Sequence, residues 1–217
     1  MSTQPDVVLA RWQHSPTQAG TTTVLPDGCC DLILRVDAAV RAHWMVSPLA
    51  QHAYDVAGQA GERWVGFRLQ PGATIDAQAL LRAVRRLGAE VEDARILAAI
   101  ERHARLDGRT QEALAALAQS RSVGSAARTL GVGERSLERL ALAATGQPPR
   151  YWRTLARVRR AAQALAGPAP LAAVAADHGF ADQAHFSREC ARWLGRTPSR
   201  LRADPAVLAV ALASGYA

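Results

Sequence analysis

Hydrophobic and polar residues change their spacing along the chain, and the first third carries the pattern of strands. Short alternating or apolar runs occur there, and turn residues such as "PDG" and "QPG" separate them. The runs are "TTTVLP", "CCDLILRV", "HWMV" and "RWVGFRLQ". Such runs between turn residues are typical of strands and hairpins. We therefore expect a small β-rich domain in residues 1–73.

From Thr74 onward the apolar residues recur with helical spacing. One expected helical face holds Leu80, Leu81, Val84 and Leu87, and a second holds Ile96, Leu97 and Ile100. These faces predict connecting helices in residues 74–108. The polar segment "RLDGRT", residues 105–110, contains a glycine and is the predicted hinge to the rest of the chain.

The chain beyond the hinge nearly repeats itself as two helix-turn-helix patterns. The first has apolar residues around Gly131, namely Val123, Ala126, Ala127, Leu130, Val132, Leu137 and Leu140. The second has them around Gly179, namely Leu171, Val174, Ala175, Phe180, Phe186 and Cys190. Each pattern predicts a short helix with a small residue for close packing, a turn at the glycine, and a second helix. The second turn is one residue longer, because Phe186 follows Gly179 at a greater distance than Leu137 follows Gly131.

A single long helix is predicted between the two patterns, in "PPRYWRTLARVRRAAQALAG", residues 148–167. Prolines are common at a helix start, and Gly167 with Pro168 ends the segment. The expected fold class is α+β, with a small β-rich N-terminal domain, connecting helices and an all-α C-terminal domain in residues 109–204. In that domain the linker helix joins two helix-turn-helix units. Residues 205–217 are expected to form a C-terminal tail.

Positive charge is concentrated in the predicted helical domain. The formal net charge is +7, and every basic residue other than histidine is an arginine. Residues 109–204 hold 15 Arg against 7 Asp and Glu, whereas the remainder holds 11 Arg against 12. A compositional bias explains the absence of Lys but not this segregation. A basic half beside a neutral half indicates a nucleic-acid-binding domain joined to a partner domain.

The second helix of the second pattern, in "HGFADQAHFSREC", carries the candidate chemistry. On a helix over residues 181–194, the inward stripe consists of Phe186, Cys190 and Trp193. The outward side then carries Gln183, His185, Ser187 and Arg188. Amide, hydroxyl and guanidinium groups bind base edges in a major groove. The alternative is a solvated face, which more often shows pairs of opposite charge four residues apart.

These motifs resemble the DNA-binding domain of AraC/XylS-type transcription regulators from Val123 to Arg202. The segment "GFADQAHFSRECARWLGRTPSRLR" is similar to the closing signature of that family, "RVRRAAQAL" to its linker helix, and "GVGERSLERLALAATGQPPRYW" to its first unit. Two departures lie in the core, where Cys190 and Ala141 replace larger residues and suggest looser packing. A third is Ala191 with Arg192 in place of a typically Lys-rich pair. The resemblance implies a sequence-specific regulator that inserts two recognition helices into adjacent major grooves of double-stranded DNA.

The resemblance also implies individual roles. Base contacts in one groove are assigned to Arg135, Glu138 and Arg139, and in the next groove to Gln183, His185, Ser187 and Arg188. Phosphate contacts are assigned to Arg150, Arg153, Arg157, Arg196 and Arg200. Glu138 would accept a hydrogen bond from cytosine or orient an arginine, since phosphates repel a carboxylate. For each phosphate arginine, a solvated side chain is the alternative.

In the first half, "LPDGCCDLILRV" and "VGFRLQPGA" resemble the N-terminal sensor region of a subgroup of the same family. That resemblance implies a small-molecule effector or a homodimer contact, and RNA polymerase is the further partner expected of such a regulator. Cys29 and Cys30 raise the alternative of a thiol-based redox switch. Neighbouring strand residues point to opposite faces, so at most one of the two is buried and they cannot easily hold one metal ion. Two further sets of residues could each line a pocket, and the alternative for each residue is a place in the core or on the surface. The first set is His43, His52 and Asp55, and the second is Trp12, Trp44 and Trp64.

Enzymatic activity is not expected. A DNA-repair methyltransferase with this kind of domain needs a Pro-Cys-His-Arg setting or four zinc-binding cysteines, but the chain has only Cys29, Cys30 and Cys190. It also lacks a phosphate-binding glycine loop, a zinc-protease motif and a nucleophile elbow. We therefore expect no cofactor and no metal. Neither a membrane helix nor a signal-peptide pattern is found, so we expect a cytoplasmic protein with reduced thiols.

Overall fold

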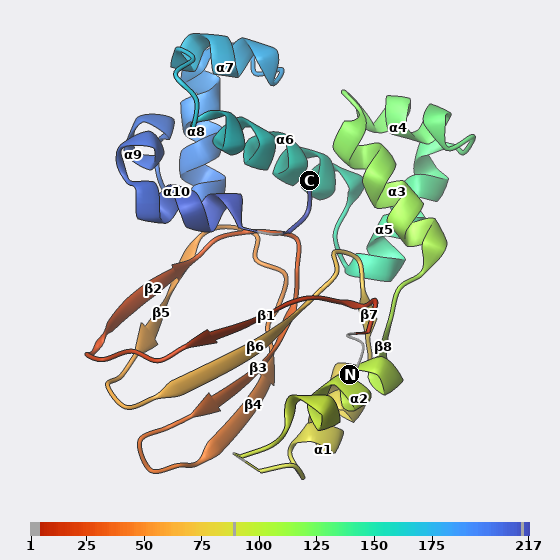
Figure 1. Ribbon diagram of the computed structural model, residues 1–217. Helices are drawn as coiled ribbons and strands as arrows, with labels where there is room; N and C mark the ends of the chain where they lie inside the picture. The colour runs from red at the N-terminus through yellow and green to blue at the C-terminus, as the bar shows by residue number, and fades with distance from the viewer. Residues whose placement is uncertain (1–4, 89, 214) are drawn as a thin grey trace. The chain divides into compact units, whose positions relative to one another are not determined.

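The computed structural model describes residues 5–88, 90–213 and 215–217, apart from the side chain of Leu212 (Figure 1). Contacts between residues divide the chain into two compact units. The N-terminal unit comprises the residues up to Thr22, Cys29–Leu49 and Asp55–Gly108. The C-terminal unit comprises Thr23–Gly28, Ala50–Tyr54 and Arg109–Ala217. Two short segments of the first half of the chain therefore belong to the C-terminal unit.

An antiparallel sheet of four strands forms the centre of the N-terminal unit, in the order β1-β6-β3-β4. Its strands are β1 (Val8–His14), β3 (Asp31–Val36), β4 (Ala42–Val46) and β6 (Arg63–Leu69). A separate two-stranded sheet pairs β2 (Gly20–Val24) with β5 (Tyr54–Gly58). On β3 the side chains of Leu32, Leu34 and Val36 are buried, and Ile33 and Arg35 between them are only half-buried. This alternation follows from the two-residue period of a strand.

Two helices share the core of this sheet. They are α1 (Ala77–Val84) and α2 (Asp93–His103), and the short strands β7 (Thr74–Ile75) and β8 (Ala104–Arg105) pair at the two ends of the helical segment. The predicted apolar faces are buried, since Leu80 and Ile100 are 0% exposed in one cluster with Leu32 and Phe67. The helices that we expected to be connectors are thus part of the N-terminal unit, because their apolar faces complete the core of its sheet.

The C-terminal unit is helical. Its helices are α3 (Gly108–Gln119), α4 (Val123–Thr129), α5 (Glu134–Thr145), α6 (Pro149–Ala164), α7 (Leu171–Asp177), α8 (Gln183–Leu194), α9 (Pro198–Ala203) and α10 (Pro205–Leu212). The predicted linker helix is α6, and in Figure 1 it runs between the α4–α5 pair and the α7–α8 pair. The α+β fold class predicted from the sequence is confirmed.

The segment that we expected to be a C-terminal tail begins with α10 and ends near a buried tyrosine. The Tyr216 hydroxyl donates a hydrogen bond of 2.6 Å to the carbonyl of Leu114. Its ring lies edge-on to that of Trp152, with 4.9 Å between the ring centroids. Burial raises the pKa of Tyr216, so its hydroxyl stays protonated and keeps donating. Tyr216 is therefore part of the core of the C-terminal unit.

Candidate nucleic-acid interface

The turns of the two helix-turn-helix units have the same backbone hydrogen bonds. In the first turn the amide of Gly131 donates to Arg128 at 3.0 Å, and that of Val132 donates to Ala127 at 3.0 Å. In the second, the amide of Gly179 donates to Ala176 at 3.1 Å and that of Phe180 to Ala175 at 2.9 Å. Both glycines are left-handed, with φ of 66° and 70°, a conformation that other residues adopt only at a cost. The second turn is longer by one residue, as predicted, since residues 178–182 separate its helices where residues 130–133 separate those of the first.

The second helices of the two units, α5 and α8, match in length and in their ends. Each has 12 residues, and each is followed by a left-handed glycine, Gly146 or Gly195. A helix with proline in its first turn then begins, α6 in one case and α9 in the other. Aligned from first residue to last, α5 and α8 bring Glu138 to the position of Ser187 and Arg139 to that of Arg188. The internal repeat therefore includes candidate base-contacting residues, which occupy matching positions in α5 and α8.

The inward stripe predicted for α8 is confirmed. Phe186 and Cys190 are 0% exposed and Trp193 is 5% exposed. On α5 the corresponding buried residues are Leu137 and Ala141. Burial raises the pKa of the Cys190 thiol to about 12, so Cys190 is protonated at neutral pH and acts as a small core residue.

The candidate base-contacting side chains lie on the outer side of α5 and α8. Arg135, Glu138, Arg139, Gln183 and Arg188 are exposed, and His185 and Ser187 are half-buried. The position of His185 is the most constrained of these. Its backbone amide donates a short hydrogen bond of 2.6 Å to Asp182, its Nδ1 lies 3.3 Å from the amide of Ala181, and its ring is edge-on to Phe180.

The arginines predicted to contact phosphate fall into two groups. Arg150 and Arg200 are exposed near the starts of α6 and α9. Arg153, Arg157 and Arg196 have protein partners that the sequence did not predict. Arg153 donates to the carbonyl of Arg121 at 3.1 Å, and Arg157 donates to that of Gly179 at 3.3 Å. Arg196 forms an ion pair of 3.2 Å with Asp204, and both of its members are more than one third exposed.

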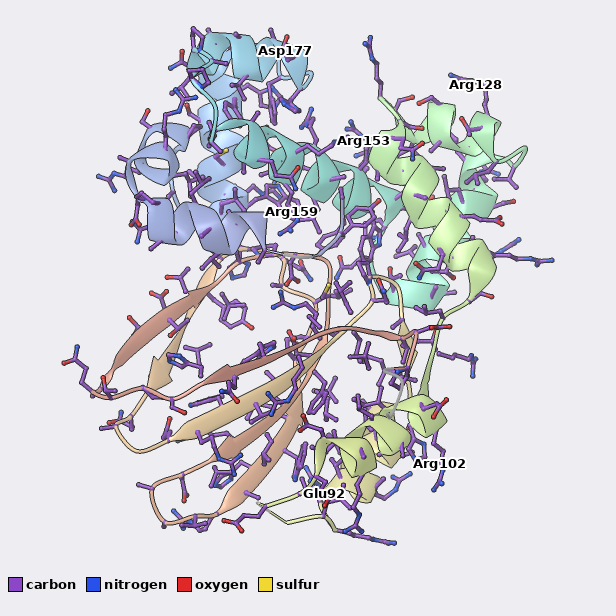
Figure 2. All side chains as sticks on the ribbon, in the orientation of Figure 1. Glu92, Arg102, Arg128, Arg153, Arg159 and Asp177 are labelled. Carbon is purple, nitrogen blue, oxygen red and sulfur yellow. The ribbon has the colours of Figure 1, made fainter. Side chains whose placement is uncertain are left out.

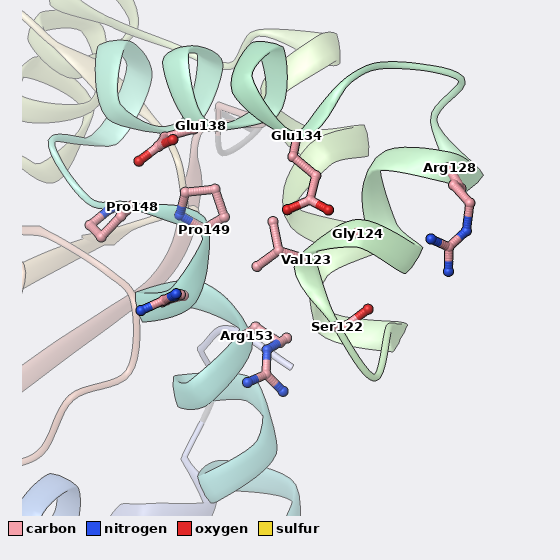
Figure 3. Close-up of a pocket in the computed structure, with 10 residues that line it drawn as sticks. Ser122, Val123, Gly124, Arg128, Glu134, Glu138, Pro148, Pro149 and Arg153 are labelled. Carbon is pink, nitrogen blue, oxygen red and sulfur yellow. The ribbon is translucent and has the colours of Figure 1, made fainter.

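An open groove lies beside α5, where the starts of α4, α5 and α6 approach one another (Figure 3). Arginine and glutamate side chains line it, among them Arg128, Arg153, Glu134 and Glu138. The carboxylate of Glu134 lies close to Gly124, since a Cβ added there would be 2.6 Å from one of its oxygens. The groove therefore contains guanidinium groups, which donate hydrogen bonds to anions such as phosphates, next to carboxylates, which accept hydrogen bonds from amines.

One important arginine was missed by the sequence analysis, Arg159 on α6, which is labelled in Figure 2. Arg159 is 1% exposed and donates to the carbonyls of Tyr216 at 3.0 Å, Ala213 at 2.7 Å and Pro26 at 3.4 Å. The helical spacing contained a signal, since Arg159 falls in the same stripe as the fully buried Trp152 and Leu155. Its burial identifies it as a structural residue that joins α6 to distant segments of the C-terminal unit.

The candidate residues of the N-terminal half each have separate surroundings. Cys29 is buried and Cys30 is half-buried, in agreement with at most one of them being inside. His43 lies 3.2 Å from a carboxylate oxygen of Asp37, while His52 is exposed in a segment of the C-terminal unit, and Asp55 is exposed in the N-terminal unit. The indole of Trp12 donates to Asp31 and that of Trp64 to Glu62, whereas Trp44 lies in the core of the sheet. Within the described residues no group of three His, Cys, Asp or Glu side chains is arranged to hold a metal ion.

Comparison with known proteins gave two kinds of match. Residues 126–204 match a family model described as a helix-turn-helix domain. No curated protein matches the sequence. One similar solved structure is ToxT from Vibrio cholerae O395, with a TM-score of 0.47 and 9% identity; the match covers 88% of this chain and 95% of that chain. Another is unsaturated fatty acid bound wild-type ToxT from Vibrio cholerae strain SCE256, with a TM-score of 0.46 and 10% identity; the match covers 93% of this chain and 97% of that chain. No helix of the described residues combines the length and apolar character required to span a membrane.

Proposed function

We propose that this chain is a DNA-binding regulator of the AraC type, in which the helix-turn-helix domain matched over residues 126–204 reads a specific site with α5 and α8 in adjacent major grooves. The observation that carries the proposal is the equivalence of α5 and α8 within one compact unit. Both helices have 12 residues, and both expose polar side chains at matched positions. The 16 residues of α6 between them span about 24 Å at 1.5 Å per residue. Successive major-groove faces are about 34 Å apart, so the proposal requires the breadth of the two units to supply the remaining distance of about 10 Å.

The proposed base contacts follow from side-chain chemistry. Arg139 and Arg188, at the same position of their helices, suit guanine, and Gln183 suits adenine. Glu138 suits a cytosine amine, and Arg135, His185 and Ser187 complete the two reading surfaces. The positive charge that attracts the phosphate backbone comes from Arg150, Arg196 and Arg200. Arg153 and Arg157, which have protein partners, add to this charge from a greater distance.

Selection of bound sequences from random duplex DNA tests this proposal. We expect a footprint of about two helical turns and base preferences in two separate blocks. Arg188→Ala is expected to weaken binding to the selected site by about 1–3 kcal/mol and to relax preference at one base pair of one block, and Arg139→Ala is expected to do the same in the other block. Arg102→Ala, at an exposed arginine of the N-terminal unit, is the matched control and should change neither property. An equal loss of affinity for every sequence would instead identify phosphate contacts, and no affinity for duplex DNA at low salt would refute the proposal.

We also propose that the N-terminal unit is the regulatory half and responds to a small-molecule effector or to self-association. Two observations support this proposal. The N-terminal unit has a core of its own. Residues 23–28 and 50–54, which interrupt its sequence, belong to the C-terminal unit. There the hydroxyl of Tyr151 on α6 donates to the carbonyl of Ala50 at 2.8 Å. A ligand that raises the unfolding temperature of the full chain and also changes its affinity for the selected site would support an effector role. Sedimentation of the full chain tests self-association.

The thiol-based switch stays a prediction. Cys190 is buried with a raised pKa, so the switch would have to involve Cys29 or Cys30, of which Cys30 is the more accessible. The test measures affinity for the selected site before and after mild peroxide, in the unaltered chain and in Cys30→Ser. A thiol-based switch at Cys30 predicts that peroxide changes the affinity of the unaltered chain but not that of the variant. An affinity that peroxide leaves unchanged excludes the switch.

A further inference from the structure

Arg157 projects from α6 into the turn of the second helix-turn-helix unit. Its side chain is only 18% exposed. The guanidinium donates to the carbonyl of Gly179 at 3.3 Å and lies 3.8 Å from a carboxylate oxygen of Glu189. Its central carbon is 4.4 Å from the centroid of the Phe180 ring, within the range of a cation–π contact. One side chain of α6 thus contacts both the turn between α7 and α8 and α8 itself.

These contacts lead directly to the proposed reading surface. The guanidinium covers Phe180, whose ring is edge-on to that of His185 at 5.5 Å and tilted against that of Phe186 at 4.9 Å between centroids. His185 is in the first turn of α8, and Glu189 is in its second. The orientation of this part of α8 therefore depends on where Phe180 and Glu189 are held.

The first unit has a different arrangement at the equivalent place. The residue after its turn glycine is Val132, which is 44% exposed, whereas the corresponding Phe180 is 5% exposed. Arg153, one helical turn before Arg157, instead donates to the carbonyl of Arg121, next to the Ser122 cap of α4. Two arginines on one face of α6 thus donate to different backbone carbonyls, Arg157 to one in the turn of the second unit and Arg153 to one just before the cap of the first unit.

We propose that Arg157 is a positioning residue for DNA recognition, which fixes the first turns of α8 relative to α6 and so determines base specificity in the second groove. Arg153 has the corresponding role for the first unit. This inference rests on the proposed function, because it assigns to both arginines an effect on base preference rather than the phosphate contact that the sequence suggested. It also explains the low exposure of Arg157, since a phosphate contact requires a side chain that DNA can reach.

The test compares Arg157→Met with Arg157→Lys on the selected DNA site. Methionine fills similar space without the guanidinium, and no described residue accepts a hydrogen bond from the buried Nε–H of Arg157, so the Met variant should fold. Lysine keeps the positive charge but cannot make the same planar fork of hydrogen bonds. We expect both variants to lose about tenfold of the discrimination at base pairs contacted by α8 and to keep discrimination at those contacted by α5. Arg153→Met should produce the opposite pattern.

A phosphate contact predicts a different result. Affinity would then fall for all sequences alike, the dependence of log affinity on log salt would decrease by about one unit, and lysine would restore binding. Arg150→Met, at an exposed arginine at the start of α6, is the control that should behave in this way. This result for Arg157 would overturn the inference while leaving the proposed function intact.

Amide hydrogen exchange of the full chain without DNA gives an independent readout. In Arg157→Met we expect faster exchange in residues 179–187, unchanged exchange in α4 and α5, and an unfolding temperature close to that of the unaltered chain. Unchanged exchange in residues 179–187 would refute the positioning role whether or not the chain binds DNA. Faster exchange throughout the C-terminal unit would also refute it, because Arg157 would then be a general stabilising residue.

Discussion

The α4–α5 unit and the α7–α8 unit have matching turn hydrogen bonds and second helices of 12 residues, but their interiors are filled differently. The first is packed with small or aliphatic residues such as Ala126, Ala127 and Leu137, whereas the second buries the aromatic rings of Phe180 and Phe186. The comparison teaches that the turn and the helix ends define this motif, and that core residues of different volume can support the same backbone. The larger core also gives the second unit a ring for Arg157 to cover.

The largest expected difference between the units is in the cost of emptying their cores. Phe186→Ala should lower the free energy of unfolding by about 3–5 kcal/mol, and we expect a smaller loss, within the range of about 2–5 kcal/mol, for the equivalent change in the first unit, Leu137→Ala. Both side chains are at most 1% exposed, so the difference reflects the volume removed. Urea unfolding of the full chain measures both values. A greater loss for Leu137→Ala would show that the first unit is the more tightly packed one.

A smaller effect, equal in the two units, is expected at the turns. Gly131→Ala and Gly179→Ala should each cost about 1–2 kcal/mol, because both residues are left-handed and a Cβ at either one meets no atom within 4 Å. The loss is therefore conformational and not steric. Gly20→Ala is the matched control, at a glycine with the same open space but without a positive φ, and should cost less. Unequal losses at Gly131 and Gly179 in thermal unfolding would mean that the two turns are not equivalent.

The smallest effects are expected at the starts of the recognition helices. Asp182 caps α8 by accepting from the amide of His185, so Asp182→Ala should cost about 1 kcal/mol. The corresponding cap of α5 is Gly133, which has no side-chain acceptor, and Gly133→Asp should stabilise the chain by a few tenths of a kcal/mol. Thermal unfolding without DNA measures both changes. A loss of stability in Gly133→Asp would contradict this assignment of the cap.

The sequence was sufficient to predict features that depend on local periodicity. The stripes of Leu80 and Val84, of Ile96 and Ile100, and of Phe186 and Cys190 are buried, because residues three and four apart share one side of a helix. The longer second turn followed from counting residues after each glycine. These predictions needed no knowledge of which elements meet in space.

Features that depend on distant segments were not predictable in the same way. An arginine in an apolar stripe is expected to reach solvent, but Arg159 remains buried because the carbonyls of Pro26, Ala213 and Tyr216 surround its guanidinium. Two of these carbonyls lie in the segment that we expected to be a tail. The partners of Arg157 likewise belong to α8 and to the turn before it, so its sequence neighbours "RVRR" do not distinguish it from a solvated arginine.

The extra residue of the second turn has a consequence for any site that the chain recognises. It places the start of α8 four residues after Gly179, whereas α5 starts three residues after Gly131. The two outer surfaces also differ in composition, with Gln183 where α5 has Glu134 and Ser187 where it has Glu138. A single chain would therefore recognise two unlike half-sites in a fixed order along the duplex. Such a site has a polarity, and inverting it would exchange the places of α5 and α8 along the duplex.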